Sequence, residues 1–302
     1  MPVATAAANV SARDPDPVPT VSANGIDVHY IAAGHGAPVV LLAGFGGDHL
    51  SWGLQFPAFR ARHHTIAIDN RGSGRSSAPD VPYTTRLMAT DIIGVLDHLG
   101  IEAAHLVGAS LGGMIAQEIA LAHPRRVLSL QLHATAGRAD PYLRILLDTW
   151  RHVSAQLGRE MVQQSMALWL FGRRSFAERP DLIEMLMRQA TVHPYAPSEA
   201  GFARQGGAVV THDALDRLGA VTCPTLITAG EDDVLVPPRF AREIAERIPH
   251  AELRIVPEAG HMWCWEKPAE FNALALDFLA KHMGGAASRP MRGAAAAPPQ
   301  SP

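Results

Sequence analysis

Cysteine is scarce in this chain. The 302 residues include only two cysteines, Cys223 and Cys264, which are too few for a disulfide framework or a structural zinc site. We expect both to act as small apolar side chains. The sequence has no run of about 18 apolar residues, so it predicts no membrane-spanning helix. The N-terminal region also lacks the continuous apolar stretch of a secretory signal, which favours a cytoplasmic location.

Neither sign of charge dominates. The formal net charge is -3 and the pI about 6.6, so we expect neither nucleic acid nor an anionic membrane surface as a partner. Lysine occurs only at Lys267 and Lys281, and this bias toward arginine is typical of GC-rich bacterial genes. Hydrophobic residues make up 47% of the chain, enough for a buried core. A small molecule is therefore the expected partner, and nothing in the sequence indicates an oligomeric state.

Signatures of cofactors and metals are missing as well. No glycine-rich dinucleotide fingerprint follows the first buried strand, which argues against a nicotinamide or flavin cofactor. His63 and His64 are adjacent, so on a strand they point to opposite faces and cannot chelate one ion. The segment DNRGSGRS (69–76) lacks the G-K-[ST] ending of a phosphate-binding loop. The sequence therefore predicts no cofactor and no metal.

Strand and helix patterns alternate along most of the chain, as expected for a mostly parallel sheet covered on both faces. The turn Asn24-Gly25 predicts a hairpin between strands near 21–22 and 26–31. Continuous apolar runs predict buried strands. Periodic apolar residues with proline or glycine stops predict helices between them. The buried strands are predicted at 38–43, 64–69, 104–109, 127–132, 225–229 and 253–256, and the helices at 85–99, 111–122, 239–247 and 268–281.

One long segment, 138–219, interrupts this alternation with several short helices and no buried strand. We interpret it as a helical cap inserted into a core formed by 21–137 and 220–283. Its apolar and methionine-rich side chains are suited to a substrate pocket, and we expect Met166 and Trp169 to line it. Trp263, just after His261, is a further candidate for the lining. The Pro/Ala/Gly-rich ends, 1–20 and 284–302, are predicted to be flexible tails.

The sequence Gly108-Ala109-Ser110-Leu111-Gly112 fits the pattern G-x-S-x-G and lies between a predicted strand and a predicted helix. This setting is typical of a nucleophile elbow, where a tight turn exposes the serine hydroxyl at a helix N-terminus. The alternative is a serine that merely caps the helix. A serine needs a base, and His261 follows the predicted strand 253–256 in a loop, where α/β folds assemble their sites.

The third member of a triad must orient the imidazole of the histidine. The stretch GEDDVLVP (230–237) offers Glu231, Asp232 and Asp233, and spacing alone does not choose among them. The order serine, acid, histidine along the chain agrees with one known triad order.

Taken together, residues 21–282 resemble the α/β-hydrolase superfamily, and specifically its lid-bearing serine hydrolases. The resemblance rests on LLAGFGG (41–47), DNRGSGRS, GASLGG, and GEDDVLVP with AGH. It implies an α/β-hydrolase fold with an eight-stranded, mostly parallel sheet. It also implies Asp233 as the acid and the backbone N–H groups of Phe45 and Leu111 as oxyanion donors. The chain departs from the family at Ala43, where histidine is common, which puts some loop-supporting hydrogen bonds in doubt.

The sequence thus predicts a cofactor-independent serine hydrolase acting on an ester-type bond of a largely apolar substrate: a carboxylic ester, a lactone or a thioester. The catalytic residues would be Ser110, His261 and Asp233. Three alternatives use the same scaffold. They are a thioesterase that releases a carrier-bound acyl or polyketide chain, a lyase, isomerase or C–C hydrolase, and a binding module with a residual triad.

Overall fold

The computed structural model describes residues 19–283, so the terminal segments 1–18 and 284–302, most of the predicted tails, lie outside it. The described chain forms one eight-stranded sheet in the order β1-β2-β4-β3-β5-β6-β7-β8. Pairing is antiparallel from β1 to β2 and from β2 to β4, and parallel elsewhere. The predicted mostly parallel, eight-stranded sheet is therefore confirmed. The strands are β1 (Thr20–Ala23), β2 (Ile26–Ala33), β3 (Pro38–Leu42), β4 (His64–Ile68), β5 (Ala104–Ala109), β6 (Val127–His133), β7 (Thr225–Gly230) and β8 (Glu252–Val256).

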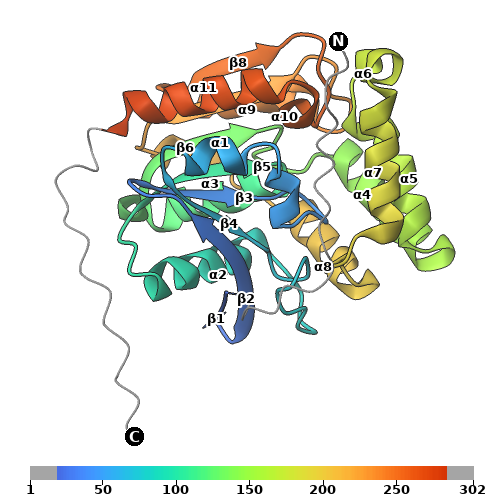
Figure 1. Ribbon diagram of the computed structural model, residues 1–302, viewed down its shortest axis with the longest axis horizontal. Coiled ribbons are helices and arrows are strands. Elements are labelled where there is room, and N and C mark those ends of the chain that lie inside the picture. Colours follow the sequence, from blue (N-terminus) through green and yellow to red (C-terminus); the bar gives the residue numbers. More distant parts are fainter. Residues whose placement is uncertain (1–18, 284–302) are drawn as a thin grey trace, which may run out of the picture.

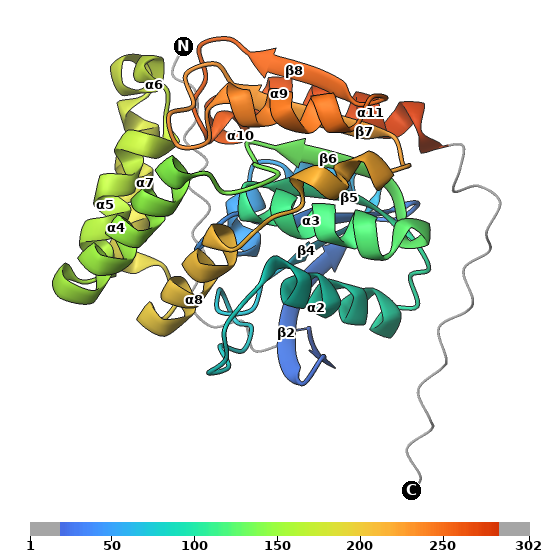
Figure 2. The same ribbon diagram turned by 180° about the vertical axis from the view of Figure 1, so that it is seen from behind.

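Helices cover both faces of this sheet, and Figures 1 and 2 show the two sides. Helices α2, α3 and α9 pack on one face, and α1 and α11 pack on the other. The short η1 (His49–Trp52), η2 (Pro124–Arg126) and η3 (Leu215–Ala220) are 3₁₀ turns. The helices of the two faces are α1 (Phe56–Arg60), α2 (Thr85–His98), α3 (Leu111–Ala122), α9 (Pro238–Arg247), α10 (Trp263–Glu266) and α11 (Pro268–Lys281).

The apolar run of β3 contains no alternating polar residues, because both faces of this strand are covered. Val40 and Leu42 belong to the core under α2 and α3, whereas Val39 and Leu41 belong to the core under α1 and α11. All four side chains are fully buried, because successive residues of a strand point to opposite faces and here both faces are covered.

Five helices lie between β6 and β7 and stand beside one end of the sheet (Figure 1). We call them the cap. Two have side-chain N-caps: Asp140 accepts the N–H of Leu143 before α4, and Ser198 accepts the N–H of Gly201 before α8. No helix in residues 19–283 is long and apolar enough to cross a membrane. The cap helices are α4 (Pro141–Leu157), α5 (Arg159–Leu170), α6 (Arg173–Glu178), α7 (Pro180–Val192) and α8 (Glu199–Val210).

Candidate active site

Ser110 occupies the single residue between β5 and α3. Its backbone has φ 52° and ψ -116°, a left-handed conformation that is costly for any residue with a side chain. Two bonds hold this turn: the Ser110 N–H donates to the carbonyl of His133 (2.9 Å), and the Thr135 hydroxyl donates to the carbonyl of Ser110 (2.7 Å). The Ser110 side chain forms no capping bond with α3, so the helix-cap alternative does not describe it.

The two glycines of the pentapeptide are required by close backbone approach. A Cβ at Gly112 would lie 2.0 Å from the carbonyl oxygen of Leu42, and one at Gly108 would lie 2.5 Å from the carbonyl oxygen of Gly112. Any larger residue would push α3 away from β3 or open the turn. The glycines thus allow the helix N-terminus to sit directly over the end of the sheet.

His261 and Asp233 meet from two loops at the same edge of the sheet, after β8 and β7. The Nδ1 atom of His261 lies 2.8 Å from Oδ2 of Asp233, and both side chains are buried. The other oxygen of Asp233 accepts the N–H groups of Leu235 (2.9 Å) and Val236 (2.8 Å). The carboxylate is therefore fixed from two sides, and it is the Asp233 side chain that contacts the imidazole.

The loop after β3 passes beside the serine: a Cβ at Gly44 would lie 3.2 Å from Cβ of Ser110. The N–H of Gly46 donates to Oε1 of Gln205 (2.9 Å) and that of Gly47 to the carbonyl of Gly44 (3.1 Å). Within residues 19–283, the N–H of Phe45 has no such acceptor. The N–H of Leu111 opens α3, where no earlier helical carbonyl exists to accept it. These are the two donors that the family resemblance implies.

One cavity of about 170 Å³ joins these parts, because Ser110, His261 and Phe45 all line it. The remaining wall is mostly apolar and comes from both the core and the cap. Met166 and Trp263 belong to it, whereas Trp169 packs edge-on against Trp150, which itself lines the cavity. Trp169 therefore does not line the cavity as predicted; it lies behind Trp150, which does. Apolar members of the wall include Leu50, Trp52, Leu170, Leu186, Phe202, Leu235, Met262 and Trp265.

Several polar side chains also line the cavity, and two of them, Asp48 and His193, lie close to each other. Asp48 is buried, and its Oδ2 lies 3.4 Å from Nε2 of His193, which comes from the loop between α7 and α8. Its Oδ1 accepts the N–H of Leu50 (2.9 Å). Burial raises the pKa of the Asp48 carboxyl. Asp48 and His193 therefore form a polar site within the mostly apolar wall of the cavity.

Glu266 was not among the predicted site residues, yet it ties the histidine loop to the cap. One of its oxygens accepts the N–H of Gly260 (2.6 Å), and the other accepts the N–H of Gly172 (2.7 Å) and the hydroxyl of Ser175 (2.6 Å). Gly172 and Ser175 belong to the cap, and Gly260 immediately precedes His261. Nothing in the local sequence indicates the contact with the cap, because Gly172 and Ser175 are more than 90 residues from Glu266.

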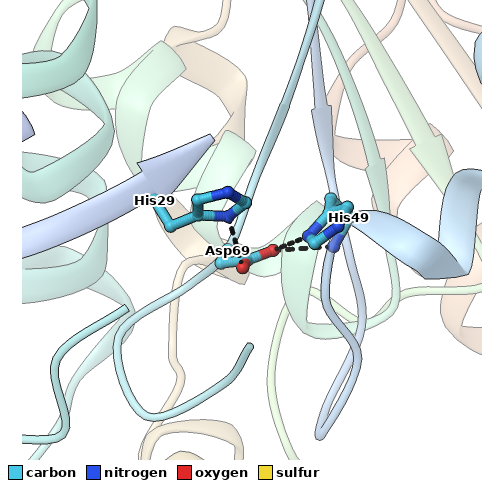
Figure 3. Close-up of side chains that lie close together, drawn as sticks. All are labelled: His29, His49 and Asp69. Atoms are coloured by element: carbon cyan, nitrogen blue, oxygen red, sulfur yellow. Dashed lines mark hydrogen bonds and ion pairs between the residues drawn. The ribbon is translucent and has the colours of Figure 1, made fainter. Parts of the chain in front are cut away.

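A second cluster, also unpredicted, surrounds Asp69 at the end of β4 (Figure 3). Nδ1 of His29 lies 2.7 Å from one carboxylate oxygen, and Nδ1 of His49 lies 2.8 Å from the other. The N–H groups of His49 and Arg75 donate to the same carboxylate. Burial by itself raises the pKa of Asp69, but these hydrogen bonds outweigh burial and hold the pKa well below its usual range.

The three side chains of this cluster include the ligand types that bind metals. Their mutual distances, however, are those of hydrogen bonds, and an ion placed about 2.0–2.2 Å from each ligand would have to break them. The cluster fastens β2, η1 and the glycine-rich turn 69–76 to one another. In that turn Arg71 forms a buried, bidentate pair with Asp91 (2.6 Å for both bonds), which supports a structural role for the segment.

Residues 37–268 match the family model described as the alpha/beta hydrolase fold. The chain belongs to the α/β-hydrolase family. A protein of Azorhizobium caulinodans named as the carbamate hydrolase RutD is 33% identical over 261 residues, which cover 86% of this chain and 98% of that protein. Similar relatives with the same name occur in Variovorax paradoxus and other bacteria.

Solved structures agree with this family. Est816, described as an N-acyl homoserine lactone degrading enzyme, has a TM-score of 0.76 and 31% identity, covering 86% of this chain and all of that one. The enol-lactonase of Burkholderia xenovorans has a TM-score of 0.79 and 26% identity, covering 87% of this chain and all of that one. A thermophilic esterase of Thermogutta terrifontis has a TM-score of 0.80 and 26% identity, covering 88% of this chain and all of that one, so the structural neighbours of this hydrolase include both an esterase and lactonases.

Proposed function

We propose that this α/β-hydrolase is a serine hydrolase that cleaves a small carboxylic ester or lactone through a Ser110–His261–Asp233 triad. The observation that carries the proposal is the position of Ser110. It stands on a left-handed turn at the start of α3, in the same cavity as an imidazole that is paired to a buried carboxylate. This is the arrangement that acyl transfer requires.

In the proposed reaction, Oγ of Ser110 attacks the carbonyl carbon while Nε2 of His261 takes the hydroxyl proton. The oxyanion is stabilised by the N–H groups of Phe45 and Leu111. When the tetrahedral intermediate collapses, the bond between the carbonyl carbon and the leaving oxygen breaks. The leaving oxygen receives the proton from His261, and an acyl group remains on Ser110. Water then attacks that carbonyl with His261 again as base, the bond from the acyl carbon to Oγ of Ser110 breaks, Oγ regains its proton from His261, and the carboxylic acid is released. Asp233 stabilises the imidazolium formed in both steps.

The cavity supports a small substrate. Its volume of about 170 Å³ lies below the range of roughly 300–1,000 Å³ common for drug-sized ligands, and its wall is mostly aromatic and aliphatic. A long carrier-bound or polyketide chain is therefore a less suitable substrate than a short ester or lactone. The lactone form is favoured further by the names of two of the structural neighbours.

Carbamate hydrolysis is the second candidate, and the names of the relatives at 33% identity favour it. A carbamate presents the same carbonyl to Ser110 and differs in the nitrogen next to it. Asp48 and His193 would suit such a polar group, because both line the cavity.

The deciding experiment combines one variant, one probe and one substrate panel. Ser110→Ala should lower kcat by about 10⁴-fold or more with an unchanged Tm, and a fluorophosphonate should label the native protein but not the variant. Mass spectrometry during turnover should detect an acyl group on Ser110. Esters, lactones, thioesters and carbamates of graded size then identify the substrate class. Full activity of Ser110→Ala would overturn the mechanism, and turnover without an acyl-enzyme would point to a lyase or isomerase.

A further inference from the structure

The side chain of Gln205 connects the cap to the loop beside the nucleophile and to the glycine-rich turn 69–76. Gln205 lies on α8 and is completely buried. Its Oε1 accepts the N–H of Gly46 (2.9 Å), and its Nε2 donates to the carbonyl of Arg71 (2.8 Å) and to Oγ of Ser73 (2.7 Å). Gly46 belongs to the loop after β3, and Arg71 and Ser73 belong to the glycine-rich turn.

These partners leave the amide only one orientation. A backbone N–H can only donate and a backbone carbonyl can only accept, so Oε1 must face Gly46 and Nε2 must face Arg71. Both N–H bonds and one oxygen lone pair are used. A buried amide satisfied in this way is rigid, and removing it would leave polar backbone groups buried without partners.

The bond to Gly46 holds the loop that passes beside Ser110. The two N–H groups that follow Phe45 are held, that of Gly46 by Gln205 and that of Gly47 by Gly44, whereas within residues 19–283 the N–H of Phe45 has no such acceptor and is available to an oxyanion. The ring of Phe45 is also held by the cap, because its centroid lies 4.3 Å from that of Phe202. Phe202 and Gln205 are on the same helix, so α8 contacts this loop at two successive residues, Phe45 and Gly46.

We propose that Gln205 is a positioning residue for the oxyanion hole, so that the cap completes the catalytic machinery as well as covering the substrate. Gln205 does not touch the reacting atoms. It holds the 44–47 loop so that the N–H of Phe45 points at the oxyanion. An electrostatic donor is effective only when it is fixed before the charge develops, so a loosened loop lowers the rate of chemistry more than it lowers substrate affinity. The inference rests on the proposed serine hydrolase function.

The test replaces Gln205 with leucine, which has a similar volume and no hydrogen-bonding group. We expect kcat to fall roughly 10- to 100-fold, part of the 10²- to 10³-fold effect of losing an oxyanion donor, while KM changes less than about threefold. A trifluoromethyl ketone, whose adduct with Ser110 carries an oxyanion, should lose affinity in proportion to kcat/KM. Gln205→Glu keeps an oxygen for Gly46 and should recover part of kcat.

Val209→Ala is the matched control, because Val209 is a buried residue of the same helix that does not line the cavity. It should lower Tm and leave kcat and the ketone affinity unchanged at a temperature where both variants are folded. If Gln205→Leu does not fold, Gln205→Asn takes its place, because the shorter amide cannot reach both loops and must show the same loss of kcat.

Each outcome has a separate meaning. Native kcat in folded Gln205→Leu or Gln205→Asn, or an equal loss in Val209→Ala, would overturn the positioning role. Failure of the fluorophosphonate to label Ser110 would instead overturn the proposed function. A rise in KM with unchanged kcat would also contradict the inference, since it would mean that Gln205 shapes the binding pocket and not the oxyanion hole.

Discussion

Three carboxylates follow β7, and their surroundings differ although they are neighbours in sequence. Glu231 is exposed, Asp232 is half-buried, and Asp233 is buried with both oxygens occupied. The turn that begins at Asp233 provides this difference, because the N–H groups of Leu235 and Val236 draw one oxygen inward. The other oxygen is then left to face His261.

Exchanging single carboxylates for amides tests this assignment. In Asp233→Asn the amide oxygen can still accept from Leu235 and Val236, but the NH₂ group then faces Nδ1 of His261 and favours the wrong tautomer. We expect kcat to fall by about 10³- to 10⁴-fold. Asp232→Asn should stay within about threefold of the native kcat. Steady-state kinetics on one good ester compares the two variants, and a larger loss in Asp232→Asn would reverse the assignment.

Within the candidate site, the residues that could be predicted from the sequence are those that carry a local signature. Ser110 is marked by its pentapeptide, and His261 by its place after a strand. Asp233 was selected only through the family resemblance. The contacts of Gln205 and Glu266 with distant segments, and the pairing of Asp69 with His29 and His49, had no local signature; Gln205 and Gly46, for example, are 159 residues apart. Such contacts arise from how the elements pack, which local spacing does not encode.

At the level of elements, the prediction was best where burial leaves a strong pattern. The helix predicted at 268–281 and the strand predicted at 104–109 match α11 and β5 at both ends. The cap was predicted only as a set of short helices. Its helices pack against one another and against the core, so their apolar residues do not form a single stripe that would reveal each boundary. The order of strands in the sheet also required the structure.

Glycines on two helices of this fold give a matched test of packing. A Cβ at Gly207 of α8 would meet no atom within 4 Å, whereas one at Gly112 of α3 would strike the carbonyl of Leu42. Gly207→Ala should therefore raise the free energy of unfolding by about 0.5–1 kcal/mol, since alanine favours the helix and restricts the unfolded chain. Gly112→Ala should lower both stability and activity. Urea denaturation measures both variants, and a destabilised Gly207→Ala would show that α8 is packed more tightly there.

For the molecule as a whole, several histidines are buried in the core as neutral rings. Burial lowers the pKa of His105 to about 4, of His133 to about 3 and of His212 to about 4. Each ring has a hydroxyl within hydrogen-bond distance of Nδ1, from Ser129, Thr228 and Thr85 respectively. The fold thus holds three bases whose protons are bound far more weakly than in the unfolded chain.

This difference predicts loss of stability in mild acid. Between pH 6.5 and about 4 the unfolded chain binds protons at these three imidazoles and the folded protein does not, so stability falls as the pH is lowered. Each imidazole contributes a slope of up to about 1.4 kcal/mol per pH unit. Paired carboxylates such as Asp69, whose pKa is lowered, add to the loss only below about pH 4. The histidine effect therefore begins at a higher pH than the carboxylate effect.

Tm measured from pH 7.5 to 4 in wild type and in His105→Gln tests the histidine contribution. The glutamine can still bond to Ser129 but binds no proton, so the variant should lose Tm less steeply than wild type below pH 6.5. His152→Gln is the control, because His152 is exposed on α4 and its replacement should leave the slope unchanged. Identical slopes in wild type and His105→Gln would mean that the buried ring is protonated without unfolding. The acid sensitivity would then have to come from other groups, such as His133, His212 or the paired carboxylates.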